Sequence, residues 1–351
     1  MIPKNPNKVI LGLSGGVDST AAALLLKEKG LSVIGLFLDV TGCNEEGRHS
    51  AENTAKELNI PFLYYDVSDR FQQEVVSYFQ DEYLEGRTPN PCVVCNPQIK
   101  FRTLIEIADQ QEAPFIATGH YARTYYDENL EQWFIRKAQS EDRDQSYMLY
   151  RLPKEVISRL IMPLGEIHGK DRVRQLAENA GLSNANKKDS QEICFLPEGV
   201  NYIQYLENLG VSAPKGPFLD QAGNPLGEHK GIYHYTIGQR KGLGDSFGKP
   251  MFVKSLQNEG HAVVLTDNEN DLFKSQVISY NNIVSIPFEG VRVDAKIRYA
   301  AKPAPAFIHA IGDNQIETLF DEPQRAPTPG QSIVFYLGDF VVGGGFIDPT
   351  T

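Results

Sequence analysis

The first third of the chain alternates between two patterns of apolar and polar positions. Short, nearly continuous apolar runs are typical of strands that are buried on both faces of a parallel sheet. Four such strands are predicted, over residues 9–13, 32–38, 61–67 and 114–118. The intervening segments favour helices, which are predicted over residues 21–29, 50–59, 69–84 and 99–109. This alternation predicts an α/β fold with a doubly wound parallel sheet, in which ligands bind beyond the carboxyl ends of the strands.

The pattern changes twice in the remainder of the chain. An aromatic-rich alternation over residues 121–138 predicts a hairpin, and mainly helical patterns follow up to about residue 210. After Gly210, short β-type runs are separated by Gly- and Pro-rich turns, which is typical of a small barrel or sandwich. We therefore predict a catalytic domain (1–140), an α-rich central domain (141–210) and a β-rich region (211–351) that ends in a barrel-like domain.

A polar, glycine-rich turn joins the first strand to the first helix. It reads Ser-Gly-Gly-Val-Asp-Ser over residues 14–19, so backbone N–H groups at the helix start can converge on an anion. The commoner phosphate loop ends in Gly-Lys-Ser/Thr, but no lysine occurs between Lys8 and Lys27. The segment therefore predicts a phosphate-binding loop of another kind than that of kinases and GTPases. The alternative is a glycine-rich turn that binds nothing.

Charge and composition restrict the classes of partner. The formal net charge of −11 argues against a dedicated nucleic-acid-binding protein, so an RNA partner must meet a local basic face. One candidate is the stretch 230–244, which holds Lys230, Arg240, Lys241 and two tyrosines without an acidic residue; a solvated loop is the alternative. Without an apolar run of about 18 residues or a signal-peptide core, a cytoplasmic location without membrane contact is expected.

The cysteines are too few for a secreted disulfide framework, and their neighbours suggest chemistry. Cys92 and Cys95 fall in residues 88–96, where prolines and asparagines predict an exposed loop. Lys100 and Arg102 follow, and a thiol near cations and a helix start is expected to have a lowered pKa. The alternative for this pair is two incidental buried cysteines.

The two other cysteines differ in their surroundings. Cys194 lies in a polar segment behind Lys187-Lys188, which is again a thiol beside cationic groups. Cys43 has no comparable neighbours, and we interpret it as incidental.

Nine short motifs resemble, in this order, those of the tRNA-specific 2-thiouridylase family, over essentially the full chain. They are Ser-Gly-Gly-Val-Asp-Ser (14–19), Gly-Arg-Thr-Pro-Asn-Pro (86–91), Cys95-Asn96, Lys100-Phe101, Thr-Gly-His-Tyr (118–121), Asp-Gln-Ser-Tyr (144–147), Asp189-Ser190, Ile-Cys-Phe (193–195) and Gly-Gln-Arg-Lys-Gly-Leu-Gly (238–244). The first of these resembles the pyrophosphate loop of the adenine-nucleotide alpha hydrolase group. The resemblance implies that fold for the catalytic domain.

The resemblance also implies an activity, which is replacement of the 2-oxygen of the wobble uridine of tRNA by sulfur. ATP, with Mg²⁺, would adenylate the oxygen, and Cys194 would carry the sulfur as a persulfide. Cys95 would then release the sulfur and form a disulfide with Cys194, which a cellular thiol must reduce. The implied partners are tRNA, a sulfur-relay protein or cysteine desulfurase as donor, and a thiol reductant.

Further site residues are implied by the same resemblance. Those implied for the nucleotide are Gly12, Leu13, Ser14, Gly15, Gly16, Val17, Asp18, Ser19, Leu38 and Gly119. Those implied for the target base are Asn90, Pro91 and Cys92. Those implied for tRNA contact are His120, Arg143, Asp144, Gln145, Arg298, Tyr299 and Gln331.

The sequence departs from the family at Cys92, where many members carry an aspartate proposed as a general base. One alternative is that Cys92, Cys95 and Cys194 hold a 4Fe–4S cluster, because such clusters are bound by cysteine thiolates. Two other functions also remain open. One is a pyrophosphate-loop ligase or amidotransferase acting on a small molecule, and the other is a non-catalytic sulfur carrier or RNA-binding protein.

Overall fold

The computed structural model describes residues 6–184, 193–244, 247–312 and 314–351, and the chain divides into two compact units. The first unit comprises Met1–Val75, Cys92–Phe195 and Asp339–Val341. The second comprises Val76–Pro91, Leu196–Gly338 and Val342–Thr351. Within the described ranges, no helix is both long and apolar enough to cross a membrane.

A five-stranded parallel sheet forms the centre of the first unit, which confirms the predicted fold class. Its strand order is β3-β2-β1-β4-β7. The strands are β1 (Lys8–Gly12), β2 (Ser32–Asp39), β3 (Phe62–Asp66), β4 (Phe115–Ala117) and β7 (Leu160–Ile161). Four of them match the predicted strands. β7 was not predicted, because a strand of two residues is too short to carry a strand pattern of its own.

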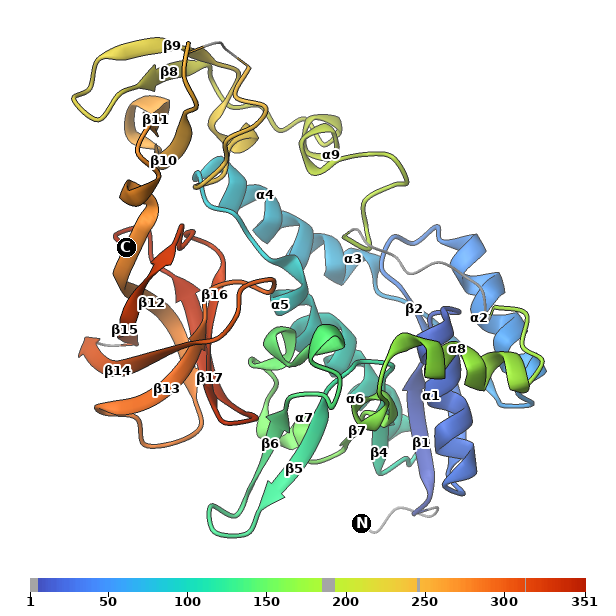
Figure 1. The fold of residues 1–351 in the computed structure, drawn as a ribbon. Helices are drawn as coiled ribbons and strands as arrows, with labels where there is room; N and C mark the ends of the chain where they lie inside the picture. The colour runs from blue at the N-terminus through green and yellow to red at the C-terminus, as the bar shows by residue number, and fades with distance from the viewer. Residues whose placement is uncertain (1–5, 185–192, 245–246, 313) are drawn as a thin grey trace. The chain divides into compact units, whose positions relative to one another are not determined.

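Helices cover this sheet and bury its apolar side chains. Val9, Leu11 and Leu13 are almost fully buried, and Ala21, Ala22 and Leu26 of the first helix pack in the same core. The helices that contribute to this core are α1 (Val17–Glu28), α2 (Glu45–Glu57) and α8 (Lys170–Asn179). α3 (Ser68–Phe71) and the π-helical turn η1 (Gln72–Val76) follow β3 in the chain. α8 lies beside α1 (Figure 1).

The strand order reverses direction between β1 and β4, which is the position where open α/β sheets bind ligands. Leu11 of β1 pairs with Ala117 of β4 in parallel register. The glycine-rich turn after β1 and the segment Thr118–His120 after β4 therefore leave the sheet side by side.

The segment that holds Cys92 and Cys95 is helical, so the prediction of an exposed loop is wrong. α5 (Pro91–Cys95), the π-helical turn η2 (Asn96–Phe101) and α6 (Arg102–Gln110) follow one another without a break. Proline is tolerated in a first helical turn, where its missing N–H leaves no hydrogen bond unmade, so Pro91 begins the helix instead of blocking it. Pro97 lies further inside, where the widened π-helical turn accommodates it.

Short elements complete the first unit. The predicted hairpin is present as β5 (Arg123–Asp127) and β6 (Gln132–Arg136), and β6 pairs with Phe340 and Val341 at the start of β17. Besides β7, the elements between β6 and α8 are η3 (Glu141–Arg143), η4 (Ser146–Leu149), α7 (Lys154–Ile157) and η5 (Pro163–Glu166). Helical turns thus dominate the stretch that was predicted to be α-rich.

The second unit contains two sheets and two longer helices. The helices are α4 (Ser77–Leu84) and α9 (Tyr202–Asn208). The smaller sheet has the order β10-β11-β8-β9, formed by β8 (Gly216–Leu219), β9 (Pro225–His229), β10 (Phe252–Gln257) and β11 (Ala262–Thr266). Phe218, Tyr235 and Val263 form its core. Three short 3₁₀ turns accompany it, η6 (Ile232–His234), η7 (Glu259–His261) and η8 (Glu269–Leu272).

The larger sheet of the second unit closes on itself, which confirms the predicted barrel. Its strands run in the order β12-β15-β14-β13-β16-β17, and β12 also pairs with β17. They are β12 (Phe273–Val284), β13 (Val291–Lys296), β14 (Ala304–Gly312), β15 (Gln315–Arg325), β16 (Ser332–Leu337) and β17 (Phe340–Ile347). Closure pairs both edge strands, so the barrel leaves no open edge.

Candidate functional site

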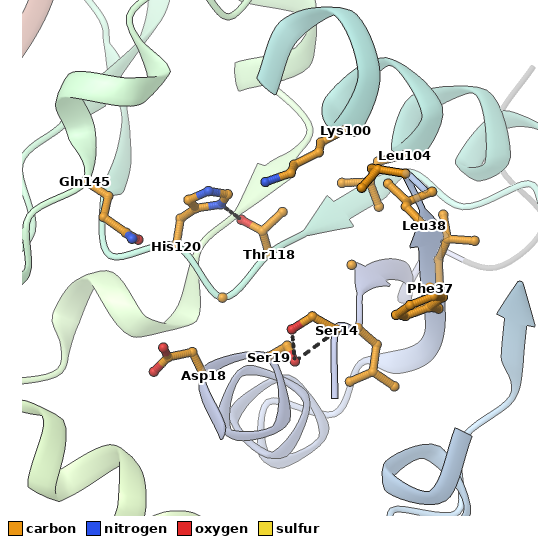
Figure 2. A pocket seen from close by; sticks show the side chains of 15 residues that line it. Ser14, Asp18, Ser19, Phe37, Leu38, Lys100, Leu104, Thr118, His120 and Gln145 are labelled. Carbon is orange, nitrogen blue, oxygen red and sulfur yellow. Dashed lines mark hydrogen bonds between the residues drawn. The ribbon is translucent and has the colours of Figure 1, made fainter. Parts of the chain in front are cut away.

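A cavity of about 270 Å³ opens at the carboxyl ends of β1, β2 and β4 in the first unit (Figure 2). The loop after β1 forms one wall, Leu38 of β2 forms another, and Gly119 and His120 lie after β4. The predicted nucleotide residues that line it are Gly12, Leu13, Ser14, Asp18, Ser19, Leu38 and Gly119. Lys100, Leu104, Thr118 and Gln145 also contribute to its lining. The cavity is thus polar at the loop and apolar near β2.

The loop leaves helix N–H groups available to an anion. Gly16 is the N-cap of α1 and has no side chain to cap the helix, while the first N–H groups of a helix have no intrahelical partner. Ser19 instead uses its hydroxyl to donate to the Gly16 carbonyl at 3.0 Å, which fixes the turn. An anion at this position would meet the positive end of the helix dipole.

Close contacts hold the loop in place from outside. Gly15 has a φ of +73°, and an added Cβ would lie 2.7 Å from the Ala51 backbone nitrogen. The Gly15 carbonyl accepts hydrogen bonds from Ser50 Oγ and from Asn184 Nδ2, both at 3.1 Å. Asn184 is buried and was not singled out in the sequence, because an isolated asparagine outside any motif carries no signal.

Asp18 accepts hydrogen bonds from side chains that lie far away in the sequence. Its carboxylate accepts two hydrogen bonds from Lys170 Nζ, both at 2.7 Å, and one from the Tyr121 hydroxyl at 2.6 Å. The Lys170 side chain is only 5% exposed, against 34% for Asp18. A buried cation thus lies directly behind the phosphate loop, although the loop itself contains no lysine. Lys170 was missed because 152 residues separate it from Asp18.

Three thiols and one ammonium group interact in the same unit. Lys100 interacts electrostatically with Cys92, Cys95 and Cys194. Cys95 is buried, Cys92 is partly buried and Cys194 is exposed. The Phe195 ring packs against Phe71 of α3, with ring centroids 5.3 Å apart, and anchors the segment next to Cys194. All four cysteines of the chain are free thiols.

The prediction that the paired thiols have lowered pKa values is wrong. Burial raises the pKa of Cys95 to about 12, although the Lys100 charge opposes the shift. Burial likewise raises the pKa of Cys92, again against the effect of Lys100. Burial disfavours the charge of Lys100 itself, but its interactions with Cys95, Cys194 and Cys92 outweigh this and raise its pKa. Both buried cysteines are therefore neutral thiols near neutral pH.

His120 interacts with Lys100, whereas Arg102 forms ion pairs with two glutamates. Burial and the nearby Lys100 charge lower the pKa of His120 to about 3, so its imidazole is neutral near pH 7. Its Nδ1 lies 2.9 Å from Thr118 Oγ1. Arg102, which was expected to act on the thiols, instead forms ion pairs with Glu106 and Glu74.

The predicted tRNA-contact residues fall in both units. In the first unit, Gln145 Oε1 accepts a hydrogen bond from the Tyr121 N–H at 2.9 Å. Asp144 accepts from Ser146 Oγ at 2.7 Å and from the Ala138 N–H at 2.9 Å, so it stabilises a turn. The neighbouring Arg143 interacts with Asp142 at 3.7 Å.

The remaining predicted contact residues belong to the second unit. Arg298 donates to the Arg325 carbonyl at 3.2 Å, and Tyr299 is 37% exposed. Gln331 Nε2 donates to the Thr88 carbonyl at 2.8 Å, and this bond fixes the chain two residues before Asn90. Asn90 is partly buried, and Pro91 is the first residue of α5.

The basic stretch 230–244 fits its predicted role only in part. Lys230, Arg240 and Lys241 are exposed, but Tyr233 and Tyr235 are 4% exposed and belong to the core. The tyrosines therefore cannot stack on bases. Two other sequence features, Lys187-Lys188 and Asp189-Ser190, lie outside the described residues.

Comparisons with known proteins cover nearly the whole chain. Three family profiles match in succession, namely "tRNA methyl transferase HUP domain" over residues 7–198, "tRNA methyl transferase PRC-barrel domain" over 203–267 and "Aminomethyltransferase beta-barrel domain" over 273–347. A "tRNA-specific 2-thiouridylase MnmA" from Clostridioides difficile (strain 630) is 45% identical over 97% of this chain and 98% of its own length. A protein of the same name from Acetivibrio thermocellus is 43% identical over 97% of this chain and 99% of its own length.

Solved structures match less closely. The NMN synthetase of Francisella tularensis matches 53% of this chain and 67% of its own chain, with a TM-score of 0.34 and 18% identity. The nearly full-length similarity to the two thiouridylases, together with the three profiles in the same order, is decisive for the family. The chain belongs to the tRNA-specific 2-thiouridylase family.

Proposed function

We propose that this protein uses ATP to replace the 2-oxygen of the wobble uridine of tRNA with sulfur. The observation that carries the proposal is that Lys100, which interacts with Cys92, Cys95 and Cys194, also lines the cavity of the phosphate loop. Nucleotide chemistry and thiol chemistry can therefore meet within one unit. A methyl transferase, the name in two of the family profiles, has no evident use for either feature.

The first half of the reaction is activation of the base. The C2 carbonyl of uridine is a poor electrophile and its oxygen cannot leave, so transfer of AMP to that oxygen creates a leaving group. The α1 N-terminus would hold the departing pyrophosphate, with Ser14 and Ser19 beside it. Leu38 and the apolar end of the cavity suit an adenine ring. Mg²⁺ bound to ATP would neutralise part of the phosphate charge.

The second half is sulfur transfer, and the two cysteines differ in a way that suits it. Cys194 is exposed and can receive sulfur from a protein donor as a persulfide, whereas Cys95 is buried beside Lys100. Cys95 would attack the Cys194 sulfur, so that a disulfide forms and hydrosulfide leaves to attack C2. AMP then departs from the base, and a cellular thiol reduces the disulfide.

The iron–sulfur alternative does not fit the described thiols. In the described part of the chain, no group of three His, Cys, Asp or Glu side chains is placed to hold a metal ion. We therefore assign no step to a cluster.

The substrate contacts and the domain division form part of the proposal. Asn90, Pro91 and Cys92 would line the site of an extruded base. The proposed tRNA contacts are His120, Arg143, Asp144, Gln145, Arg298, Tyr299 and Gln331. A sulfur-relay protein or a cysteine desulfurase would deliver sulfur, and residues 1–140, 141–210 and 211–351 would act as catalytic, tRNA-contacting and β-rich regions.

Release of pyrophosphate from ATP, measured with and without tRNA, tests this function against its rivals. We expect release only when tRNA is present. A ligase acting on a small molecule would not need tRNA, and a non-catalytic carrier would release no pyrophosphate. Cys95→Ser and Cys194→Ser should both retain tRNA-dependent release while losing thiolation, with Cys43→Ser as the matched control. Failure of either variant at pyrophosphate release would contradict the division of roles.

A further inference from the structure

Lys100 is a cation that lines the nucleotide cavity without a hydrogen-bonded partner among the described residues. It lies in η2, and its side chain extends toward His120 (Figure 2). Within residues 6–184, 193–244, 247–312 and 314–351, no oxygen accepts a hydrogen bond from its ammonium group. A partly buried charge without such a partner is costly, so this arrangement favours binding of an anion.

Lys170 shows what a structurally satisfied lysine looks like in the same unit. Its ammonium donates to both carboxylate oxygens of Asp18 at 2.7 Å. Lys100 has no carboxylate in that role, and the groups that interact with it are three thiols and the neutral His120. A role in packing alone would not require an ammonium group at the cavity wall.

The local helix geometry brings Lys100 to Cys95. They are five residues apart across η2, and a π-helical turn bonds residues five apart where an α-helix bonds residues four apart. Such turns are frequent at functional sites. The widened turn thus places the ammonium group on the side of the helix that carries the thiol, while the same ammonium reaches the cavity.

We infer that Lys100 serves both halves of the reaction, as the cation that binds the nucleotide phosphate remaining in the cavity and as the counter-ion of the Cys95 thiolate. This inference rests on the proposed function, and it assigns to one side chain the link between activation and sulfur transfer. The anion it binds in the first half is a nucleoside monophosphate or its ester with the base.

With Lys100 in this role, the bonds, electrons and proton of the sulfur-transfer step are all accounted for. The Cys95 thiol and the Cys194 persulfide anion react so that the Cys95–Cys194 disulfide bond forms and the sulfur–sulfur bond of the persulfide breaks. The Cys95 sulfur is oxidised to the disulfide level while the Cys194 sulfur keeps its oxidation state. The terminal sulfur is reduced and leaves as hydrosulfide with the bond pair and the proton from Cys95. Lys100 stabilises the negative charge that Cys95 carries as it attacks.

The reactivity of each cysteine toward iodoacetamide tests the thiolate half, without tRNA or a sulfur donor. Alkylation of the full-length chain is followed by mass spectrometry of its peptides, and exposed Cys43 serves as the internal reference. In Lys100→Met, the Cys95 rate relative to Cys43 should fall about tenfold, because the rate follows the thiolate fraction. Lys100→Arg should restore most of the rate. Equal relative rates in wild type and Lys100→Met, including rates too slow to detect, would overturn this role.

Calorimetric titration with AMP tests the phosphate half. Lys100→Met should weaken AMP binding about tenfold, whereas exposed Lys29→Met at the far end of α1 should bind AMP as wild type does. If Lys100→Met does not fold, Lys100→Gln takes its place in both measurements. Unchanged AMP affinity would overturn the shared role. Because neither measurement involves thiolation, a wild-type protein that fails to thiolate tRNA would contradict the proposed function alone.

Discussion

Asp18 shows how a residue can have its predicted location and yet a different environment. The sequence placed it correctly in the polar turn at the start of the first helix, where no partner for its carboxylate was predicted. In the structure, Asp18 instead compensates buried Lys170 and accepts a hydrogen bond from Tyr121. A cation at the first turn of α8 opposes the helix dipole, which makes its carboxylate partner more important for stability.

We therefore expect Asp18→Ala to destabilise the protein as well as abolish AMP transfer. Removal of one partner leaves a buried charge unpaired, at a cost of about 1–3 kcal/mol for this partly exposed pair. Urea unfolding measures the loss. The double variant Asp18→Ala/Lys170→Met should recover most of the stability but not the activity. A single variant as stable as wild type would contradict the pairing.

His120 should make stability depend on pH in a defined window. Its pKa is about 3 in the folded protein, whereas an unfolded histidine has a pKa of about 6.5. Between these values the unfolded chain binds a proton that the folded chain does not, so stability falls as the pH decreases from about 6.5 toward 3. From pH 7 to pH 5, wild type should lose on the order of 2 kcal/mol more than His120→Asn in urea unfolding. Parallel losses in the two proteins would show that the ring titrates normally.

Cys92 replaces the aspartate of many family members, and its raised pKa makes it a neutral thiol. A neutral thiol cannot accept a proton as a carboxylate does, so we expect Cys92 to line the base pocket without acting as a base. Cys92→Ser should then change the thiolation rate by less than about threefold, as expected for loss of packing rather than loss of a reacting group. A loss as large as that of Cys95→Ser, measured under the same conditions, would assign Cys92 a chemical role.

At the scale of elements, the close approach of the β4 turn to α1 shapes the site. An added Cβ at Gly119 would lie 2.9 Å from the carbonyl carbon of Asp18 and 2.9 Å from the Ser19 nitrogen, both backbone atoms. Backbone cannot yield as a flexible side chain does. The turn that carries His120 and the start of the phosphate helix thus depend on glycine at this position.

Gly119→Ala should therefore separate the two segments and weaken nucleotide binding. We expect a destabilisation of about 1–3 kcal/mol, which is typical of overpacking. Gly312→Ala in β14 is the matched control, because it lies outside the cavity lining and its added Cβ would meet only the Gln315 side chain, at 3.6 Å. Thermal unfolding and AMP titration of both variants measure the effect. Equal behaviour of the two alanine variants would show that the contact is not limiting.

In the helical segment from Pro91 to Gln110, the local sequence pattern gave a wrong prediction for the first residues. Prolines and asparagines are typical of turns, and this signal favoured a loop, but proline is also compatible with a first helical turn. The burial of Cys95, the π-helical turn η2 and the resulting rise in thiol pKa depend on packing that no local pattern records. The chemistry of the cysteines could be suspected from the sequence, whereas their electrostatics could not.

At the scale of the whole molecule, periodic patterns predicted the sheet and the barrel well. Buried strands such as β1 and β2 have short, continuous apolar runs, which are typical of strands in a parallel sheet. The alternation of these runs with helical patterns along the chain implied the parallel sheet. The carboxyl-end location of the phosphate loop then followed from topology. Lys170 and Asn184, by contrast, reach the loop from more than 150 residues away, so only the folded chain shows them.

The same limit applies to the division of the chain. The compact units do not follow the sequence in order, because Val76–Pro91 belongs to the second unit and Asp339–Val341 to the first. A domain division predicted from the sequence consists of consecutive segments. It therefore cannot assign a short segment to a unit that is formed by distant parts of the chain. The functional division at residues 140 and 210 therefore stays a prediction.

Mass spectrometry of nucleosides tests the central claim most directly. tRNA is incubated with the protein, ATP and a persulfide-generating sulfur source, then digested, and its nucleosides are analysed. We predict 2-thiouridine at the wobble position only when ATP and sulfur are both present, and none with Cys95→Ser or Cys194→Ser. Unmodified uridine with the wild-type protein under these conditions, or thiolation that persists without either cysteine, would contradict the account.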